Sequence, residues 1–160
     1  MALGDMFLKI EGTKQGAIKG ELKDSSHKEE IDVLGWSWGM ESNISLQSGL
    51  AAAKTSMSEL IVVKRVDKAS TALMASLRNN ELLKNVTLTV RKAGKTPLEY
   101  YKVVLQDSRL TSIKQQNGEA EGAPDCSESI SLSFKKVTVE YTPQGDDGLP
   151  QGATTFEAEL

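Results

Sequence analysis

Residues 86–91 read Val-Thr-Leu-Thr-Val-Arg, an alternation of apolar and polar side chains. In a β-strand this alternation places Val86, Leu88 and Val90 on one face and the two threonines on the other. A short turn with Gly94 follows, and residues 98–105 read LEYYKVVL, which suits a return strand. The stretch therefore predicts a hairpin with one face in the core.

More strands are predicted on both sides of this hairpin. Their ranges are 6–11, 16–22, 31–40, 60–66, 109–113 and 130–141. In two of them the apolar face shifts, near Gly35 and at Lys135-Lys136, which predicts a bulge at each place. Only residues 67–80 read as a helix, with Ser70 or Thr71 as its N-cap and Asn79-Asn80 at its end.

One short helix among about eight strands predicts an all-β fold, in which two packed sheets form a small β-barrel and the helix closes one end. Residues 41–54 are too long for a tight turn and are expected to form an extended loop. Residues after Tyr141 contain two prolines and three glycines, so we expect a flexible C-terminal tail. The domain organisation is then one domain at 1–142 and a tail at 143–160.

Composition removes several classes of function. The 160 residues are 39% hydrophobic, enough for one core, and 19 Lys and Arg against 22 Asp and Glu give a net charge of -3. This balance argues against nucleic acid as a partner. The chain holds one histidine, His27, and one cysteine, Cys126. A histidine-based triad could use only His27, and one chain has too few of these residues for a structural zinc site made of cysteine and histidine alone. We therefore expect no metal site.

The two scarce residues have plain interpretations. His27 lies in the charged stretch DSSHKEE, which predicts a solvated turn. The neighbouring Glu29, Glu30 and Asp32 lack the spacing of a calcium loop and are expected to form an exposed acidic edge. Cys126 has no base nearby in the sequence and is expected to be a free, inert thiol.

The sequence also bears on location. No run of about eighteen apolar residues is present, so we expect no membrane insertion. The first residues lack the basic and apolar regions of a secretory signal. We expect a protein made in the cytoplasm that would leave the cell only by a route without a cleaved signal peptide.

Trp36 and Trp38 leave two interpretations open. They share a face of the strand at 31–40 and, because each can bury a large area, are expected to belong to the core. The alternative is that they stack on a sugar, which would make the protein a monomeric carbohydrate-binding β-sandwich module.

Several stretches together carry a family resemblance. The chain resembles the haemolysin-coregulated protein (Hcp) family, the tube protein of bacterial type VI secretion systems, over about residues 3–144. The matching stretches follow the family's order and approximate spacing: DMFLKIEG (5–12), GELKDSSHKEEIDV (20–33), HKEEIDVLGWSWGM (27–40), VVKRVDKASTALM (62–74), TLTVRKAG (87–94), EYYKVVL (99–105) and VTVEYTPQ (137–144).

The resemblance implies a function without a reaction or a cofactor. It implies a small barrel of two sheets with one helix, copies that assemble into hexameric rings, and rings that stack into a tube expelled by a contracting sheath. The implied partners are other copies of the chain, small effector proteins carried or stabilised in the lumen, and the sheath and spike of the machine. The protein would be secreted by that system.

Two sets of site residues follow. Ser37 alternates with the tryptophans and matches the family's cargo-contacting position in WSWG, which implies that it faces the lumen. The loop at 41–54 is apolar for a loop, and we expect it to contact a neighbouring subunit or ring. The other possibility is that it folds back on its own barrel. Its candidate contact residues are Ile44, Leu46, Leu50, Ala51, Ala52 and Ala53.

Overall fold

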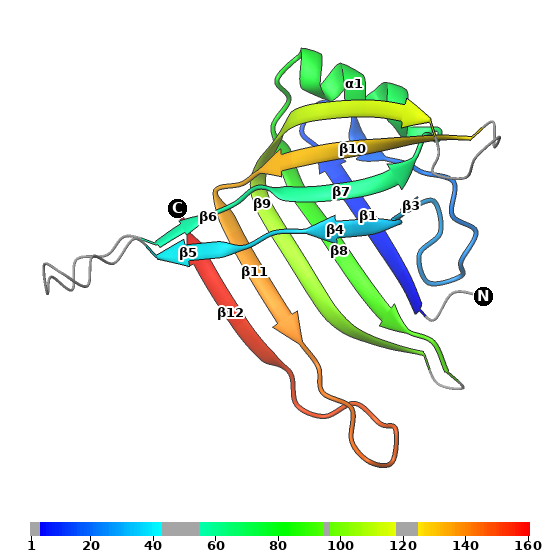
Figure 1. Cartoon of the computed structure of the whole chain (residues 1–160), viewed down its shortest axis with the longest axis vertical. Coiled ribbons are helices and arrows are strands. Elements are labelled where there is room, and N and C mark those ends of the chain that lie inside the picture. The colour runs from blue at the N-terminus through cyan, green and yellow to red at the C-terminus, as the bar shows by residue number, and fades with distance from the viewer. Residues whose placement is uncertain (1–3, 43–54, 95–96, 118–124) are drawn as a thin grey trace, which may run out of the picture.

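The computed structural model of the chain describes residues 4–42, 55–94, 97–117 and 125–160. Within these residues the chain is mostly β with one helix, as predicted (Figure 1). The elements are β1 (Gly4–Gly12), β2 (Gly16–Ile18), β3 (Ile31–Asp32), β4 (Gly35–Ser37), β5 (Met40–Ser42), β6 (Thr55–Met57), β7 (Leu60–Arg65), α1 (Ala69–Arg78), β8 (Leu83–Lys92), β9 (Leu98–Asn117), β10 (Cys126–Ser133), β11 (Lys136–Tyr141) and β12 (Thr154–Glu159).

The main sheet closes on itself as a barrel. Its strands follow the order β2-β1-β8-β9-β10-β7-β4, and all neighbours are antiparallel. Closure comes from the short segment that holds β3 and β4, because β3 pairs with β1 while β4 pairs with β7. Strands β8 and β9 of the predicted hairpin are neighbours near the middle of this strand order, with Val86 opposite Leu105 and Leu88 opposite Val103, all four fully buried.

The segment that closes the barrel contains the predicted irregularity near Gly35. Ile31 and Val33 are buried, and strand alternation would next place Gly35 against the core. Instead, the next residue that packs against the core is Trp36. The face therefore shifts between Val33 and Trp36, at the point where pairing passes from β1 to β7. As a result Ser37 is exposed.

Strand β9 is one long strand where two were expected. Its first half pairs with β8 and β11, and its second half pairs with β10. Between the halves Asp107 has a φ of 51°, and the neighbouring Ser108 donates a hydrogen bond from Oγ to the carbonyl of Ser133 at 2.5 Å. This bend lets one strand serve both sides of the barrel.

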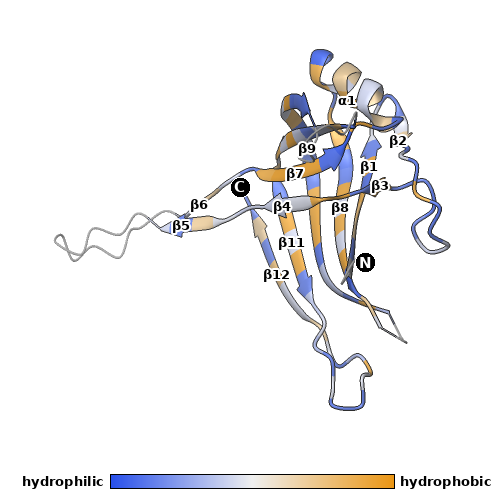
Figure 2. Ribbon diagram, turned by 45° about the vertical axis from the view of Figure 1, so that its right-hand side comes forward, coloured by the Kyte–Doolittle hydropathy of each residue, from blue (hydrophilic) through white to orange (hydrophobic). Residues whose placement is uncertain are grey.

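Helix α1 lies across one end of the barrel, as Figures 1 and 2 show, and buries Leu73. The helix ends as predicted, with Asn79 at the C-cap and Asn80 at a φ of 51°. The predicted N-cap is wrong: Lys68 occupies the cap position, and Ser70 is buried inside the first turn, where it bonds to other side chains. No helix in the described part of the chain has the length and apolar character needed to cross a membrane.

The expectation of a flexible tail from residue 143 is wrong for residues 154–159. They form β12, which pairs with β11 along its whole length, with Phe156 opposite Val139 and Ala158 opposite Val137. Glycine and proline are confined to the connection that precedes β12, whereas Phe156 and Ala158 alternate with polar residues and continue the apolar face of β11. The sheet thus runs past the expected domain boundary at residue 142.

The expected extended loop is described only at its ends. Met40–Ser42 and Thr55–Met57 pair as a separate two-stranded sheet that projects from the barrel (Figure 1). The candidate contact residues Ile44, Leu46, Leu50, Ala51, Ala52 and Ala53 lie outside the described residues.

Candidate functional site

Ser37 lies on the outside of the barrel wall. It pairs with Ile61 on β7, whereas Trp36 pairs with the fully buried Val62. Directly paired residues share a face, so Ser37 and Ile61 point outward and Trp36 points inward, where it stacks on Tyr101 with ring centroids 5.6 Å apart. Ser37 is thus exposed on the face opposite Trp36, and that it faces a lumen stays a prediction.

A row of small hydroxyl side chains continues from Ser37 across the wall. Ile61 pairs on its other side with Ser131 of β10, and Ser131 pairs with Ser112 of β9. The Oγ atoms of Ser112 and Ser131 lie 3.4 Å apart. One step along β10, Ser129 also points outward, between Val63 and Lys114. We call Ser37, Ile61, Ser112, Ser129 and Ser131 the hydroxyl face.

Of the residues on the hydroxyl face, the sequence-based prediction named only Ser37. A signal was present in residues 127–133, SESISLS, where serine occupies every second position and Glu128, Ile130 and Leu132 fill the positions between them. These three residues are buried, so the alternate serines at 129 and 131 must face out. Strand pairing then places Ser112 beside Ser131, and Ser37 in the same row on the other side of Ile61.

The hydroxyl face itself carries no charge, and charged groups lie at its borders. Thr111 donates a hydrogen bond to Glu59 at one border. Arg65 and Asp32 form an exposed ion pair at 3.4 Å at another. The centre is therefore a polar surface of small groups around one exposed isoleucine, Ile61, whose exposed fraction is 40%. Such a surface can accept and donate hydrogen bonds to many partners without selecting for charge.

A buried ionic network supports the wall from inside. Lys64 is fully buried, and its Nζ donates to Glu128 Oε1 at 2.6 Å and to Asp67 Oδ1 at 2.8 Å. Ser70 of α1 donates to the same Glu128 oxygen, and Gln115 donates to its other oxygen at 3.2 Å. We call these five residues the Lys64 network. It joins β7, β9, β10 and α1.

Burial raises the pKa of Glu128, but the hydrogen bonds from Lys64, Ser70 and Gln115 outweigh burial and hold that pKa below its usual value. Glu128 is therefore a stable anion at neutral pH. Because both charges are enclosed, the pair keeps a fixed geometry that an exposed pair would not have. The wall that carries the hydroxyl face is thus anchored to the helix that closes the barrel.

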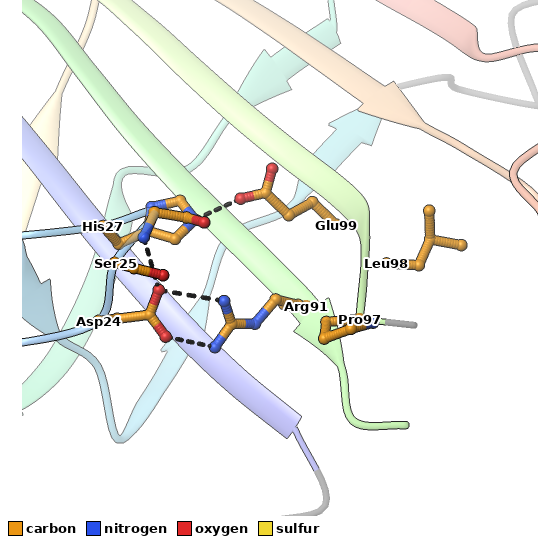
Figure 3. A pocket seen from close by; sticks show the side chains of 8 residues that line it. Asp24, Ser25, His27, Arg91, Pro97, Leu98 and Glu99 are labelled. Atoms are coloured by element: carbon orange, nitrogen blue, oxygen red, sulfur yellow. Dashed lines mark hydrogen bonds and ion pairs between the residues drawn. The ribbon is translucent and has the colours of Figure 1, made fainter. Parts of the chain in front are cut away.

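The other side of the barrel holds a second cluster, around His27. The expectation of a solvated turn for His27 is wrong: its ring is buried and stacks on Phe7 with centroids 4.0 Å apart. Nδ1 lies 2.9 Å from Glu30 Oε2. On the other side of the ring, Nε2 contacts Glu99, as Figure 3 shows. The charged residues next to His27 in the sequence predicted an exposed turn. The contact with Glu99 could not be predicted from them, because Glu99 lies 72 positions away in the chain.

A pocket of about 790 Å³ opens beside this cluster, between residues 24–27 and the start of β9 (Figure 3). Arg91 donates to Asp24 Oδ2 at 2.8 Å and to Asp5 Oδ2 at 2.7 Å. The bond from Arg91 lowers the pKa of Asp24 to about 2, and both carboxylates raise the pKa of Arg91. The guanidinium of Arg91 and the carboxylates of Asp5 and Asp24 therefore pair with one another. These contacts hold residues 19–30 against the barrel.

Cys126 is exposed and free, as expected. Among the described residues no group of three or more His, Cys, Asp or Glu side chains could hold a metal ion.

Comparison with known proteins gives a consistent result. The sequence model of the family described as "Type VI secretion system effector, Hcp" matches residues 7–141. The chain is 37% identical over 151 residues to "Protein hcp1" of Pseudomonas aeruginosa, covering 92% of this chain and 89% of that protein.

Two solved structures share the fold closely. Hcp1 from Salmonella typhimurium superposes with a TM-score of 0.78 at 32% identity, over 99% of this chain and 95% of that one. A protein described as "Structure of a type six secretion system protein" superposes with a TM-score of 0.86 at 25% identity, over 98% and 96%. The similarity thus extends over nearly the whole of each chain.

Proposed function

Since the chain belongs to the Hcp family of type VI secretion proteins, we propose that it is a subunit of the inner tube of that machine. Copies form hexameric rings, the rings stack into a tube, and the tube is secreted by that machine. Its partners are other copies of the chain and the sheath and spike components. The family is one of structural and secreted proteins, and this role needs neither a reaction nor a cofactor.

The hydroxyl face carries the second half of the proposal. Small effector proteins are carried or stabilised in the lumen, and Ser37 contacts them together with Ser112, Ser129 and Ser131. The supporting observation is that Ser37, Ser131 and Ser112 lie in one row across paired strands, with Ile61 between Ser37 and Ser131, and that Ser129 lies next to Ser131 on the same outward face. Weak hydrogen bonds, repeated around a ring, retain varied cargo and still allow release.

The loop at 41–54 supplies contacts between subunits or stacked rings. In support, the described segments on either side of it, Met40–Ser42 and Thr55–Met57, pair as a separate sheet that projects from the barrel (Figure 1). The residues proposed for this contact remain Ile44, Leu46, Leu50, Ala51, Ala52 and Ala53.

The carbohydrate-binding alternative loses support from the position of the tryptophans. Trp36 is half-buried and stacks on Tyr101, and Trp38 makes an edge contact with Phe134. A sugar platform needs an open aromatic face, and these rings pack against the core.

Negative-stain microscopy and size-exclusion chromatography with light scattering test the proposal. We expect annular particles and a mass six times that of the chain. Uniform monomers at high concentration would overturn the tube proposal, and a tryptophan fluorescence change with glycans would then favour the alternative.

A further inference from the structure

Residues 19–30 connect β2 to β3 without a strand or helix of their own, and we call this segment the strap. Its two halves are tied together where Gly20 N–H donates to the Glu29 carbonyl at 2.7 Å. Glu29 has a φ of 64°, a conformation that residues other than glycine rarely adopt, so contacts elsewhere must hold this turn. The side chains of Asp24 and His27 join the strap to the barrel.

The strap covers an aromatic side chain on the outside of the barrel. Phe7 lies between Met6 and Leu8, which pack in the core, so its ring points outward, yet only 2% of the residue is exposed. The ring of His27 stacks on that of Phe7, with centroids 4.0 Å apart and planes inclined by 11°. The Arg91 guanidinium lies 4.7 Å from the centroid of the same ring. The strap and Arg91 therefore bury Phe7, which is not part of the barrel core.

The first anchor of the strap keeps its charges over the neutral pH range. Arg91 donates to both carboxylate oxygens of Asp24, at 2.8 and 3.3 Å (Figure 3). The bond from Arg91 lowers the pKa of Asp24 to about 2, and the same contact raises the pKa of Arg91. Asp24 is therefore ionised and Arg91 protonated in both weakly acidic and weakly alkaline solution.

The second anchor, His27, depends on a proton. Its Nδ1 lies 2.9 Å from Glu30 Oε2, and its Nε2 contacts Glu99 Oε1. A neutral imidazole has one N–H, and its other nitrogen is an acceptor, as an ionised carboxylate is. With both carboxylates ionised, both contacts are hydrogen bonds only in the imidazolium form, in which both ring nitrogens donate. Loss of one proton turns one of the two contacts into a meeting of two acceptors.

Many charged groups surround His27. They are Asp5 and Lys9 of β1, Asp32 of β3, Arg91 of β8, Glu99 and Lys102 of β9, and Asp24, Lys28, Glu29 and Glu30 of the strap. Arg91 bonds to two aspartates, and Lys102 lies 3.8 Å from the second oxygen of Glu99. Glu30 and the first oxygen of Glu99 thus face the ring of His27, and without its proton two negative charges flank a neutral ring.

We propose that the strap is a proton-dependent latch. While His27 is an imidazolium, the strap is closed over Phe7; when the ring loses a proton, residues 27–30 are released while Asp24 stays bound to Arg91. Closure takes up a proton, so the closed form is favoured as pH falls and is lost as pH rises through the titration of His27. Release uncovers Phe7 beside the pocket of about 790 Å³. All of these contacts lie within one chain, so the latch works in a single copy.

The first test follows the proton and the strap together. Because the chain has a single histidine, the ring ¹⁵N signals of untagged protein report the protonation of His27 alone between pH 5 and pH 9. Hydrogen exchange of residues 27–30, measured by millisecond labelling and divided by the intrinsic exchange rate at each pH, reports closure. We expect protection to fall about 10- to 100-fold along the same pH curve as the imidazolium signal, which corresponds to the loss of one hydrogen bond to a charged group.

This comparison separates a latch from a histidine with a structural role only. Protection of the β8 amides should stay constant, which shows that the barrel itself remains folded. A neutral ring in a strap that is still protected would overturn the latch. A ring that keeps its proton up to pH 9 would do so too.

The second test removes the requirement for the second ring proton. In Glu99→Gln the side-chain amide can donate to Nε2 of the neutral ring or accept from the imidazolium, so residues 27–30 should stay protected at every pH. Glu157→Gln is the matched control, because Glu157 is exposed on β12, and it should keep the pH dependence of the unmodified protein. The same pH dependence in Glu99→Gln as in the control would contradict the proposal.

Discussion

Lys64 Nζ and Glu128 Oε1 lie 2.6 Å apart inside the barrel wall, and neither side chain has any exposed surface. Removing one partner leaves the other charge buried without compensation, at a cost of about 3–5 kcal/mol. We therefore expect Lys64→Met to lower the free energy of unfolding by about that amount in urea unfolding followed by circular dichroism. Lys84→Met, at an exposed position on β8, is the control and should change little. A loss below about 1 kcal/mol for Lys64→Met would contradict the assigned role.

Acid should weaken the fold through Asp24 and Glu128. The pKa of Asp24 falls from 3.8 to about 2 because Arg91 and the backbone N–H of Ser26 bond to it. A carboxyl whose folded pKa is depressed stabilises the fold above its unfolded pKa and loses that effect as pH falls through the folded value. We expect the melting temperature to drop between pH 4 and pH 2, with a smaller drop in Asp24→Asn. Asp146→Asn should retain the full drop, and identical profiles for all three proteins would refute the assignment.

The His27 cluster should control the mobility of residues 19–30. His27→Ala removes the stacking on Phe7 and both carboxylate contacts, which we expect to cost about 1–3 kcal/mol. Hydrogen exchange in residues 19–30 should become faster, whereas Lys28→Ala, an exposed neighbour, should leave it unchanged. Equal protection in His27→Ala and the unmodified protein would show that other contacts hold this segment.

Cargo retention should depend on the hydroxyl face. Ser37→Gln and Ser131→Gln place longer side chains on the wall without touching the core, so rings should form while co-expressed effector is retained several-fold less in a pull-down. Ser25→Gln, an exposed position beside the His27 pocket, is the control. Undiminished retention by both wall variants would argue against this surface as the cargo contact.

Gly20 should not tolerate a side chain. A Cβ atom there would lie 2.5 Å from the carbonyl oxygen of Glu30, which is backbone and cannot easily move. We expect Gly20→Ala to lower the free energy of unfolding by about 1–3 kcal/mol. Gly35→Ala meets nothing within 4 Å and should be close to neutral for stability in the same urea titration. Equal stability of the two variants would be the contrary result.

The local alternation of apolar and polar residues explains which parts of the fold could be predicted from the sequence. The strand around Val86 and the face shift near Gly35 follow from neighbouring residues, because side-chain direction repeats every second residue in a strand. The end of the helix at Asn79 follows from the local stop signal of two asparagines. Strand β12 was missed because glycine and proline precede it, and its pairing depends on the open edge of β11 rather than on its own composition.

By itself, the sequence determined that this protein is a β-barrel with one helix, with Ser37 turned outward between two inward tryptophans, and its motifs pointed to the family. Only the tertiary structure decided which residues meet. Ser37, Ile61, Ser131 and Ser112 form a row because four strands pair in one register, and His27 reaches Glu99 because the chain folds back over 72 positions. Register and long-range contact depend on closure of the whole barrel, which no local stretch of sequence specifies.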